Sequence, residues 1–100
     1  PKQVLILPIS EKFLNYAESI EKQLRENNIR VATDIRNEKV NAKIRDAELK
    51  KIPVMLIVGE KEKDSNMVSI RRRHEGDLGT KPIDKLVISL SEEIKTRRRH

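Results

Sequence analysis

Two uninterrupted apolar runs place the strongest limit on how this chain can fold. One lies within Gln3–Ile9 and the other within Pro53–Gly59. Runs of this length, without alternating polar residues, are typical of strands that are covered on both faces of a sheet. The segments around them repeat apolar residues at spacings of three and four, which is typical of amphipathic helices. The sequence therefore predicts an α/β domain with a covered central sheet.

Three helices are expected around this sheet. The first covers Glu11–Asn27 behind a Ser10 cap, the second covers Glu38–Lys50, and the third follows Pro82. In the second helix, one set of residues is expected to face inward and another to lie on the wetter sides. The inward set is Val40, Ile44 and Ala47, and the outer set is Lys39, Lys43 and Lys50.

The remaining strands are less hydrophobic. Ile29–Ile35 alternates as a half-exposed strand does, and Met67–Arg73 predicts an antiparallel strand behind a polar turn at Glu60–Asn66. Gly76–Gly79 predicts a turn with a short edge strand. Right-handed crossovers should make the first three strands parallel. We therefore expect a three-layer α/β domain, with a mixed sheet of four to five strands flanked by three helices.

One hundred residues fit one small domain, which we expect at residues 1–96 with a basic C-terminal tail at 97–100. The longest apolar run, Val54–Val58, is far shorter than the roughly 20 residues that span a bilayer. We therefore expect a soluble chain without a membrane partner. The chain starts at Pro1 without an initiator Met, which indicates a domain taken from a longer protein.

Composition argues against most catalytic and metal-binding interpretations. Cysteine is absent, and His74 and His100 are the only histidines, so neither a disulfide nor a zinc site is expected. The glycines form neither a dinucleotide fingerprint nor a P-loop. The acid pair Glu60 and Glu62 lies in a Lys-rich segment that is typical of solvated surface. We expect no catalytic residue, no metal and no cofactor in this chain.

The charge is unevenly distributed. The chain carries a net charge of +6, and the excess lies in Arg36–Lys51, Arg71–Arg73 and Arg97–Arg99. The first block holds six cations against three anions. Such blocks predict a positive surface that attracts phosphates. Two alternatives stay open: the first two blocks could only solvate their elements, and the last could be a frayed helix end.

Polar side chains follow the second and third predicted strands. Arg36 to Lys39 come after the second strand and Glu60 to Glu62 after the third, so both groups should open on one edge of the sheet. Ser69 and Arg71 could approach the same edge. Amide, carboxylate and guanidinium groups suit the reading of unpaired bases. Two structural alternatives remain: Asn37 could only cap the second helix, and Glu62 could only pair with Lys61 or Lys63.

Taken in order, these residues resemble a known family. The matching segments are Leu7–Ser10, Asp34–Lys39, Lys43–Arg45, Ile52–Glu62, Val68–Arg73 and Asp77–Gly79. They resemble the C-terminal anticodon-binding domain of class II aminoacyl-tRNA synthetases of the threonyl, prolyl, glycyl and histidyl group. Within this group the resemblance is greatest to the threonyl branch, and it covers almost the whole chain.

The resemblance implies a mixed five-stranded sheet flanked by three helices, which binds the anticodon stem-loop of tRNA. The positions that it implies for base reading are Asn37, Glu62 and Arg71. For threonine anticodons the implied bases are the second-position G and the third-position U. Phosphates of the stem-loop would be met by cations near these residues. These cations are Arg36, Lys39, Lys43, Arg45, Lys51 and Arg73.

The resemblance further implies that the fragment itself catalyses nothing. Its parent would be a cytoplasmic, homodimeric threonine–tRNA ligase that uses ATP, Mg²⁺ and Zn²⁺, while the isolated domain would be a monomer. Two other functions stay open. The chain could be a protein-interaction domain of a synthetase-like paralogue or accessory subunit, or it could serve a prolyl-, glycyl- or histidyl-tRNA synthetase. A small-ligand α/β enzyme would need a pocket with a perturbed acid or base, which the sequence does not supply.

Overall fold

The computed structural model describes residues 3–98, with side chains described through residue 95. Within these residues the chain forms one sheet with the strand order β2-β1-β3-β4-β5. The strands are β1 (Val4–Pro8), β2 (Val31–Thr33), β3 (Val54–Val58), β4 (Met67–Arg72) and β5 (Gly76–Pro82). β1 is parallel to β2 and β3, and β4 is antiparallel to β3 and β5. The predicted α/β class, the mixed sheet and its three parallel strands are confirmed.

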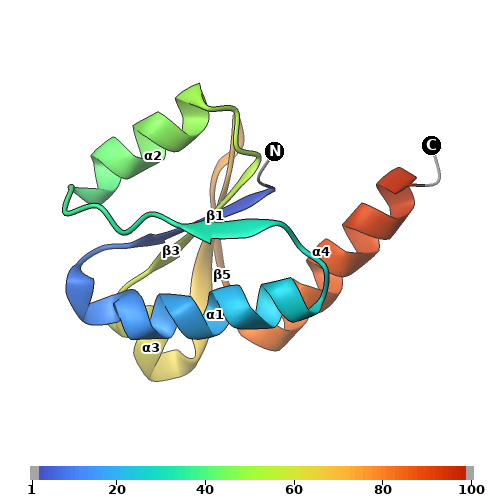
Figure 1. Cartoon of the computed structure of the whole chain (residues 1–100), viewed down its shortest axis with the longest axis horizontal. Coiled ribbons are helices and arrows are strands. Elements are labelled where there is room, and N and C mark those ends of the chain that lie inside the picture. Colours follow the sequence, from blue (N-terminus) through green and yellow to red (C-terminus); the bar gives the residue numbers. More distant parts are fainter. Residues whose placement is uncertain (1–2, 99–100) are drawn as a thin grey trace.

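Helices cover both faces of this sheet, as Figure 1 shows. α1 (Leu14–Glu26), which follows a 3₁₀ turn at Glu11–Phe13, packs on one face together with α4 (Ile83–Arg98). α2 (Val40–Leu49) packs on the opposite face. Alternate side chains of a strand point to opposite faces, so β1 and β3 contribute to both cores. The predicted three-layer arrangement is confirmed.

The segment after β3 corrects one prediction. The sequence predicted a polar turn at 60–66, but residues Glu60–Ser65 form a fourth α-helix of the described chain, α3. The Glu62 carboxylate accepts from the backbone N–H of Gly59 at 2.8 Å, and Asn66 ends the helix in the left-handed conformation with φ 54°. All five residues from 60 to 64 are charged, so no apolar periodicity marked this helix. The features that mark this helix are the Glu62 cap at its start and the left-handed Asn66 at its end.

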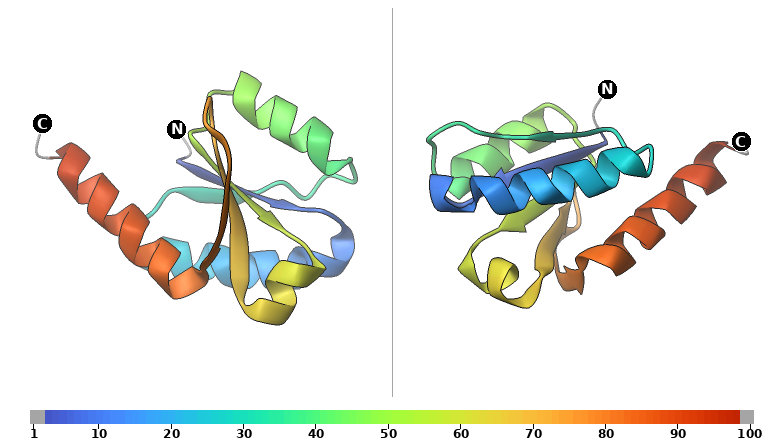
Figure 2. Two further views of the ribbon diagram at one scale, coloured as in Figure 1. Left: turned by 180° about the vertical axis from the view of Figure 1, so that it is seen from behind. Right: turned by 60° about the horizontal axis from the view of Figure 1, so that its bottom comes forward.

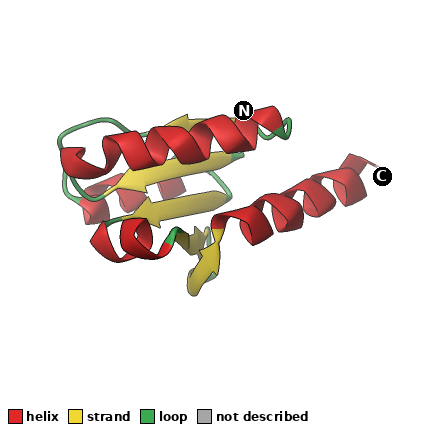
Figure 3. Ribbon diagram, turned by 90° about the horizontal axis from the view of Figure 1, so that it is seen from below, coloured by secondary structure: helices red, strands yellow, loops and turns green. Residues whose placement is uncertain are grey.

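The Tyr16 side chain links α3 and the start of β4 to α1. The Tyr16 hydroxyl, on α1, lies 3.0 Å from the carbonyl oxygen of Glu62 and 2.6 Å from that of Met67. Burial, together with the nearby Glu62 carboxylate, raises the pKa of the Tyr16 phenol. Figures 2 and 3 show α3 beside α1, on the side of the sheet opposite α2.

Several element boundaries differ from the predicted ones. β2 is shorter than the expected strand at 29–35, and β5 is a strand of seven residues rather than a short edge after a turn. α4 runs as a helix to Arg98, so the expected tail at 97–100 falls partly on its last turn, and residues 99 and 100 lie outside the described residues. None of the described helices is long and apolar enough to cross a membrane.

Candidate nucleic-acid interface

The parallel strands β1, β2 and β3 end at a common edge of the sheet, which we call the carboxyl edge. β2 is followed there by loop 34–39, which leads into α2, and β3 leads directly into α3. Asn37 lies in loop 34–39 and Glu62 lies in α3. Since β1 separates β2 from β3, the two connections start about 10 Å apart. The topology therefore opens both segments on one edge, as expected from the sequence.

Asn37 presents an uncommitted amide at this edge. Its side chain is exposed, and it makes no hydrogen bond with any other residue of the described chain. The residue at the start of α2 is Lys39, which gives the helix no side-chain cap. The alternative that Asn37 only caps the second helix is therefore wrong. An amide offers a donor and an acceptor together, which suits a base edge.

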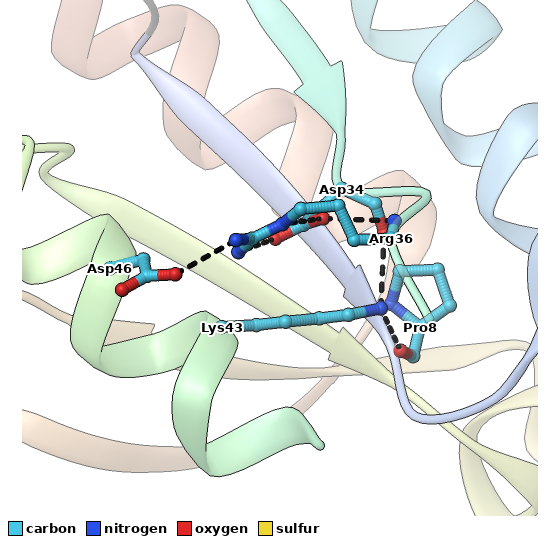
Figure 4. A network of polar contacts seen from close by, with 5 residues as sticks. All are labelled: Pro8, Asp34, Arg36, Lys43 and Asp46. Atoms are coloured by element: carbon cyan, nitrogen blue, oxygen red, sulfur yellow. Dashed lines mark hydrogen bonds and ion pairs between the residues drawn. The ribbon is translucent and has the colours of Figure 1, made fainter. Parts of the chain in front are cut away.

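Ion pairs fix the loop on the amino side of Asn37 (Figure 4). The Arg36 guanidinium donates to the Asp34 carboxylate from Nε at 3.0 Å and from Nη2 at 2.8 Å. Its Nη1 lies 2.9 Å from Oδ2 of Asp46, on α2. Hydrogen bonds from Arg36 lower the pKa of Asp34, and the two carboxylates raise the pKa of Arg36. Arg36, predicted as a phosphate contact, already has two anionic partners.

Lys43 corrects a second prediction. It was expected on a wetter side of α2, but it is only 3% exposed. Its ammonium donates to the carbonyl oxygens of Pro8 at 3.1 Å and Asp34 at 3.2 Å, which are the residues at and just beyond the ends of β1 and β2 (Figure 4). The side chain of Lys43 therefore extends from α2 to the ends of β1 and β2. Lys43 also lines the hollow beside Asn37, but its ammonium is already bonded to two carbonyl oxygens and would have to give up these bonds to hold a phosphate.

One carboxylate oxygen of Glu62 has a structural role, and the other is available to a ligand. Its Oε1 caps α3 through the Gly59 N–H, and within the described residues it forms no ion pair with Lys61 or Lys63. The alternative of a surface pair with those lysines is therefore wrong. The Gly59 position is tight, because a Cβ atom there would lie 2.7 Å from Cδ1 of Ile9. The carboxylate is held at the carboxyl edge by local backbone geometry.

Arg71 lies on the sheet rather than at its edge. It stands opposite Met55 in the β3–β4 register, and Met55 belongs to the core beneath α2, so Arg71 shares that face. Its Nε is buried and has no hydrogen-bond partner among the described residues. Asp77 is its neighbour on β5, but the Asp77 carboxylate accepts from Gly79. Ser69, opposite Ile57, lies nearer the carboxyl edge.

The predicted basic block Arg71–Arg73 is divided between the two faces of the sheet. Arg72 points toward α4, where it pairs with Glu93 through two bonds of 3.0 Å and 2.7 Å. Arg73 points toward α2 and donates from Nε to the carbonyl oxygen of Glu48 at 3.0 Å. Alternation along the strand therefore splits the block. Besides the ion-paired Arg36, the exposed cations of loop 34–39, α2 and the residues just after it are Lys39, Arg45, Lys50 and Lys51.

Two hollows lie side by side at the carboxyl edge and share a wall. The first, of about 130 Å³, is lined by Asn37 and loop 34–39, and the second, of about 450 Å³, by Phe13 and α3. Ile9 and Ser10 line both hollows, and Ile9 is 45% exposed. The turn after β1 therefore forms a partly apolar ridge between a hollow beside Asn37 and a hollow beside α3. The ridge formed by Ile9 and Ser10 was not predicted from the sequence.

The ion pairs of Arg36 with Asp34 and Asp46, which hold loop 34–39, were not predicted from the sequence. Asp34 and Asp46 are acids in a basic segment, and neither stands out by type or by periodicity. Only the two-residue spacing of Asp34 and Arg36 hinted that the pair could bond locally. The described residues contain no group of three His, Cys, Asp or Glu side chains that could hold a metal ion.

Comparison with known proteins gives a consistent result. The family described as "Anticodon binding domain" matches residues 3–93. Threonine–tRNA ligase of Clostridioides difficile (strain 630) is 50% identical over 97% of this chain, and that of Bacteroides fragilis (strain YCH46) is 53% identical over 95%. The chain spans only 15% of the length of each of these relatives.

Solved structures show the same likeness. The RNA binding domain of threonyl-tRNA synthetase from Cryptosporidium parvum Iowa II superposes with a TM-score of 0.86 at 32% identity, covering 92% of this chain and 23% of that one. Histidyl-tRNA synthetase from Nostoc sp. PCC 7120 has a TM-score of 0.81 at 22% identity, covering 97% of this chain and 22% of that one. The second likeness shows the fold alone.

Proposed function

The chain belongs to the anticodon-binding domain family, and from this premise we propose that it reads the anticodon loop of threonine tRNA for a threonine–tRNA ligase. The observation that carries the proposal is that the Arg71 guanidinium, its buried Nε included, has no hydrogen-bond or ion-pair partner within the described residues. A buried donor without a partner is costly. Arg71 as a whole is only partly buried, so a base carbonyl from a splayed nucleotide could accept from the guanidinium where it reaches the surface.

We assign base reading to Asn37, Glu62 and Arg71. The free Asn37 amide can donate and accept, and the Glu62 oxygen that does not cap α3 can accept from guanine N1 and N2. Asn37 lines the smaller hollow at the carboxyl edge, and Glu62 belongs to α3, whose residues Glu60, Lys63 and Asp64 line the larger one; unpaired bases would enter there. For a threonine anticodon, the bases read would be the second-position G and the third-position U.

Phosphates of the stem-loop would lie along α2 and its flanks. Lys39, Arg45 and Lys51 are exposed there and would position the RNA without reading its sequence. Arg73 lies at the end of α2, where its remaining guanidinium donors could join them. Lys43 has no part in this set because its ammonium is buried, and Arg36 is at most a secondary contact because two carboxylates hold it.

Ligation of threonine to tRNA would be carried out by the remainder of a longer parent protein. The ATP, Mg²⁺ and Zn²⁺ expected for such a ligase would be bound there, since the described residues supply no cluster of metal-ligating side chains. We further propose that the parent is a cytoplasmic homodimer and that this domain alone is a monomer. Sedimentation of the isolated chain tests the last point.

Binding to anticodon stem-loop RNAs tests the assignment. We expect the loop with a threonine anticodon to bind more tightly than one with its middle base changed, and Arg71→Ala to remove most of that preference. Arg30→Ala is the matched control, because Arg30 is an exposed cation at the opposite edge of the sheet. Loops with proline, glycine and histidine anticodons belong in the same series. Equal binding of all loops by the unmodified chain would refute anticodon reading.

A further inference from the structure

We propose that the Asp34–Arg36–Asp46 ion-pair chain is a positioning device that presets loop 34–39 so that Asn37 meets its base in the correct geometry. This inference rests on the proposed function and assigns Arg36 a role different from a phosphate contact. The network lies at the carboxyl edge, between the end of β2 and α2 (Figure 4).

Hydrogen bonds at the ends of β1 and β2 anchor the start of loop 34–39. The Asp34 N–H donates to the carbonyl oxygen of Ile6 at 2.9 Å, and its own carbonyl accepts from the Lys43 ammonium at 3.2 Å. The same ammonium holds the carbonyl of Pro8 at the end of β1. The point where the loop leaves the sheet is therefore fixed on both sides.

The Arg36 guanidinium clamps the loop to α2 through its bonds to Asp34 and Asp46. The Asp34 carboxylate receives three bonds from Arg36, namely Nε, Nη2 and the backbone N–H at 3.1 Å. The third guanidinium nitrogen reaches Asp46 at 2.9 Å, one turn and a half into α2. A planar fork that is bonded to two carboxylates has little freedom to rotate. It ties the loop to the helix on the amino side of Asn37.

Asn37 and Glu38 lie between the Arg36 clamp and the start of α2. Asn37 and Glu38 make no hydrogen bond with other described residues, and the next anchored residue is Lys39, whose carbonyl oxygen accepts from Ala42 and Lys43 at the start of α2. Asn37 therefore lies between two fixed residues, Arg36 and Lys39. Its orientation depends on them, and preorganisation of this kind improves recognition by reducing the entropy lost on binding.

Charge makes the inference testable, because electrostatics changes the affinity for every loop alike, whereas positioning changes the preference among loops. Asp46 is 39% exposed on a surface that would face phosphates. Asp46→Asn removes an anion, so electrostatics alone should strengthen the binding of every RNA loop. If the clamp positions Asn37, the same variant should lower the preference for the threonine loop on the order of fivefold.

The experiment measures the affinities of this chain for the threonine stem-loop and for loops with one anticodon base changed. The variants are Asp46→Asn, Arg36→Lys, Asn37→Ala and the double variant Asp46→Asn with Asn37→Ala. Arg36→Lys keeps the charge but loses the fork, so we expect it to lose preference at the same base as Asn37→Ala. In the Asn37→Ala background, Asp46→Asn should have no further effect on preference. Glu48→Gln, on the same helix and outside the network, is the charge-matched control.

The outcomes separate the two proposals. If the unmodified chain shows no preference among loops, the proposed function fails. If Asn37→Ala loses the preference while Asp46→Asn and Arg36→Lys retain it, the positioning role is overturned and the proposed function stands. Stronger binding of all loops by Asp46→Asn, with an unchanged preference, would likewise overturn it. Thermal unfolding of each variant identifies any effect that comes from lost folding.

Discussion

Substituting Lys43, whose ammonium is buried, tests most directly which cations support the fold and which contact RNA. Lys43→Met keeps an unbranched stem in the core and removes one charged hydrogen bond from each of the Pro8 and Asp34 carbonyls. Each such bond contributes about 1.5–3 kcal/mol, and part of this is offset because the ammonium no longer has to be desolvated. We expect a net loss of about 2 kcal/mol in the free energy of unfolding, or about 10 °C in Tm.

Two measurements check this expectation. Urea unfolding gives the change in stability, and the dependence of RNA affinity on salt counts the phosphates that are neutralised. Lys43→Met should leave the salt slope of the folded protein unchanged. The matched variant Lys39→Met removes an exposed cation, so it should leave stability nearly unchanged and reduce the slope by about 0.7.

Either of two results would refute the reasoning about Lys43. An unchanged or raised Tm for Lys43→Met would mean that its two carbonyl contacts contribute nothing to folding. A reduction of the salt slope equal to that of Lys39→Met would mean that the ammonium leaves its buried position and neutralises a phosphate in the complex.

Two other perturbations follow from single contacts. Tyr16→Phe removes the hydroxyl that lies against the carbonyl oxygens of Glu62 and Met67. We expect the free energy of unfolding to fall by about 1 kcal/mol, and amide hydrogens to exchange faster in α3 than in α1. Uniform exchange rates in the two helices would contradict this. Hydrogen bonds from Arg36 lower the pKa of Asp34 in the folded protein below its ordinary value of 3.8. The ionised Asp34 carboxylate therefore contributes its full stabilisation above pH 3.8, and this stabilisation is lost as the pH falls through the lowered pKa of the folded state. Asp34→Asn should therefore show a shallower loss of stability than the unmodified chain between pH 5 and pH 2, measured by urea unfolding, and parallel curves would contradict the assignment.

Strand and helix order followed from periodicity because burial imposes it. β1 and β3 are covered on both faces, and their apolar runs are uninterrupted for that reason. α3 was missed because its five leading residues are all charged and its stability depends on caps and on Tyr16 rather than on an apolar stripe. A six-residue helix of this kind leaves no periodic signal.

The candidate site was harder to predict because a cation's type does not reveal its partner. Lys43 and Lys39 lie four residues apart in the same charged segment, yet one is buried beneath the sheet's edge and the other is exposed. The helical period would place the two on similar sides. The difference arises because Lys39 precedes α2 in extended backbone, while Lys43 lies within the helix and faces the sheet.

The net charge of +6 therefore does not tell which cations are available to a nucleic acid. Lys43 is committed to backbone carbonyls, Arg36 to two carboxylates and Arg72 to Glu93 on the far face. An isolated arginine that already bonds a carboxylate must give up that bond to hold a phosphate, and the exchange gains little net energy. Affinity for the RNA backbone should thus depend on the exposed cations of α2 and its flanks, while the paired ones fix the shape in which Asn37 is presented. Positive charge within this domain serves two separable purposes, and only one of them should respond to salt.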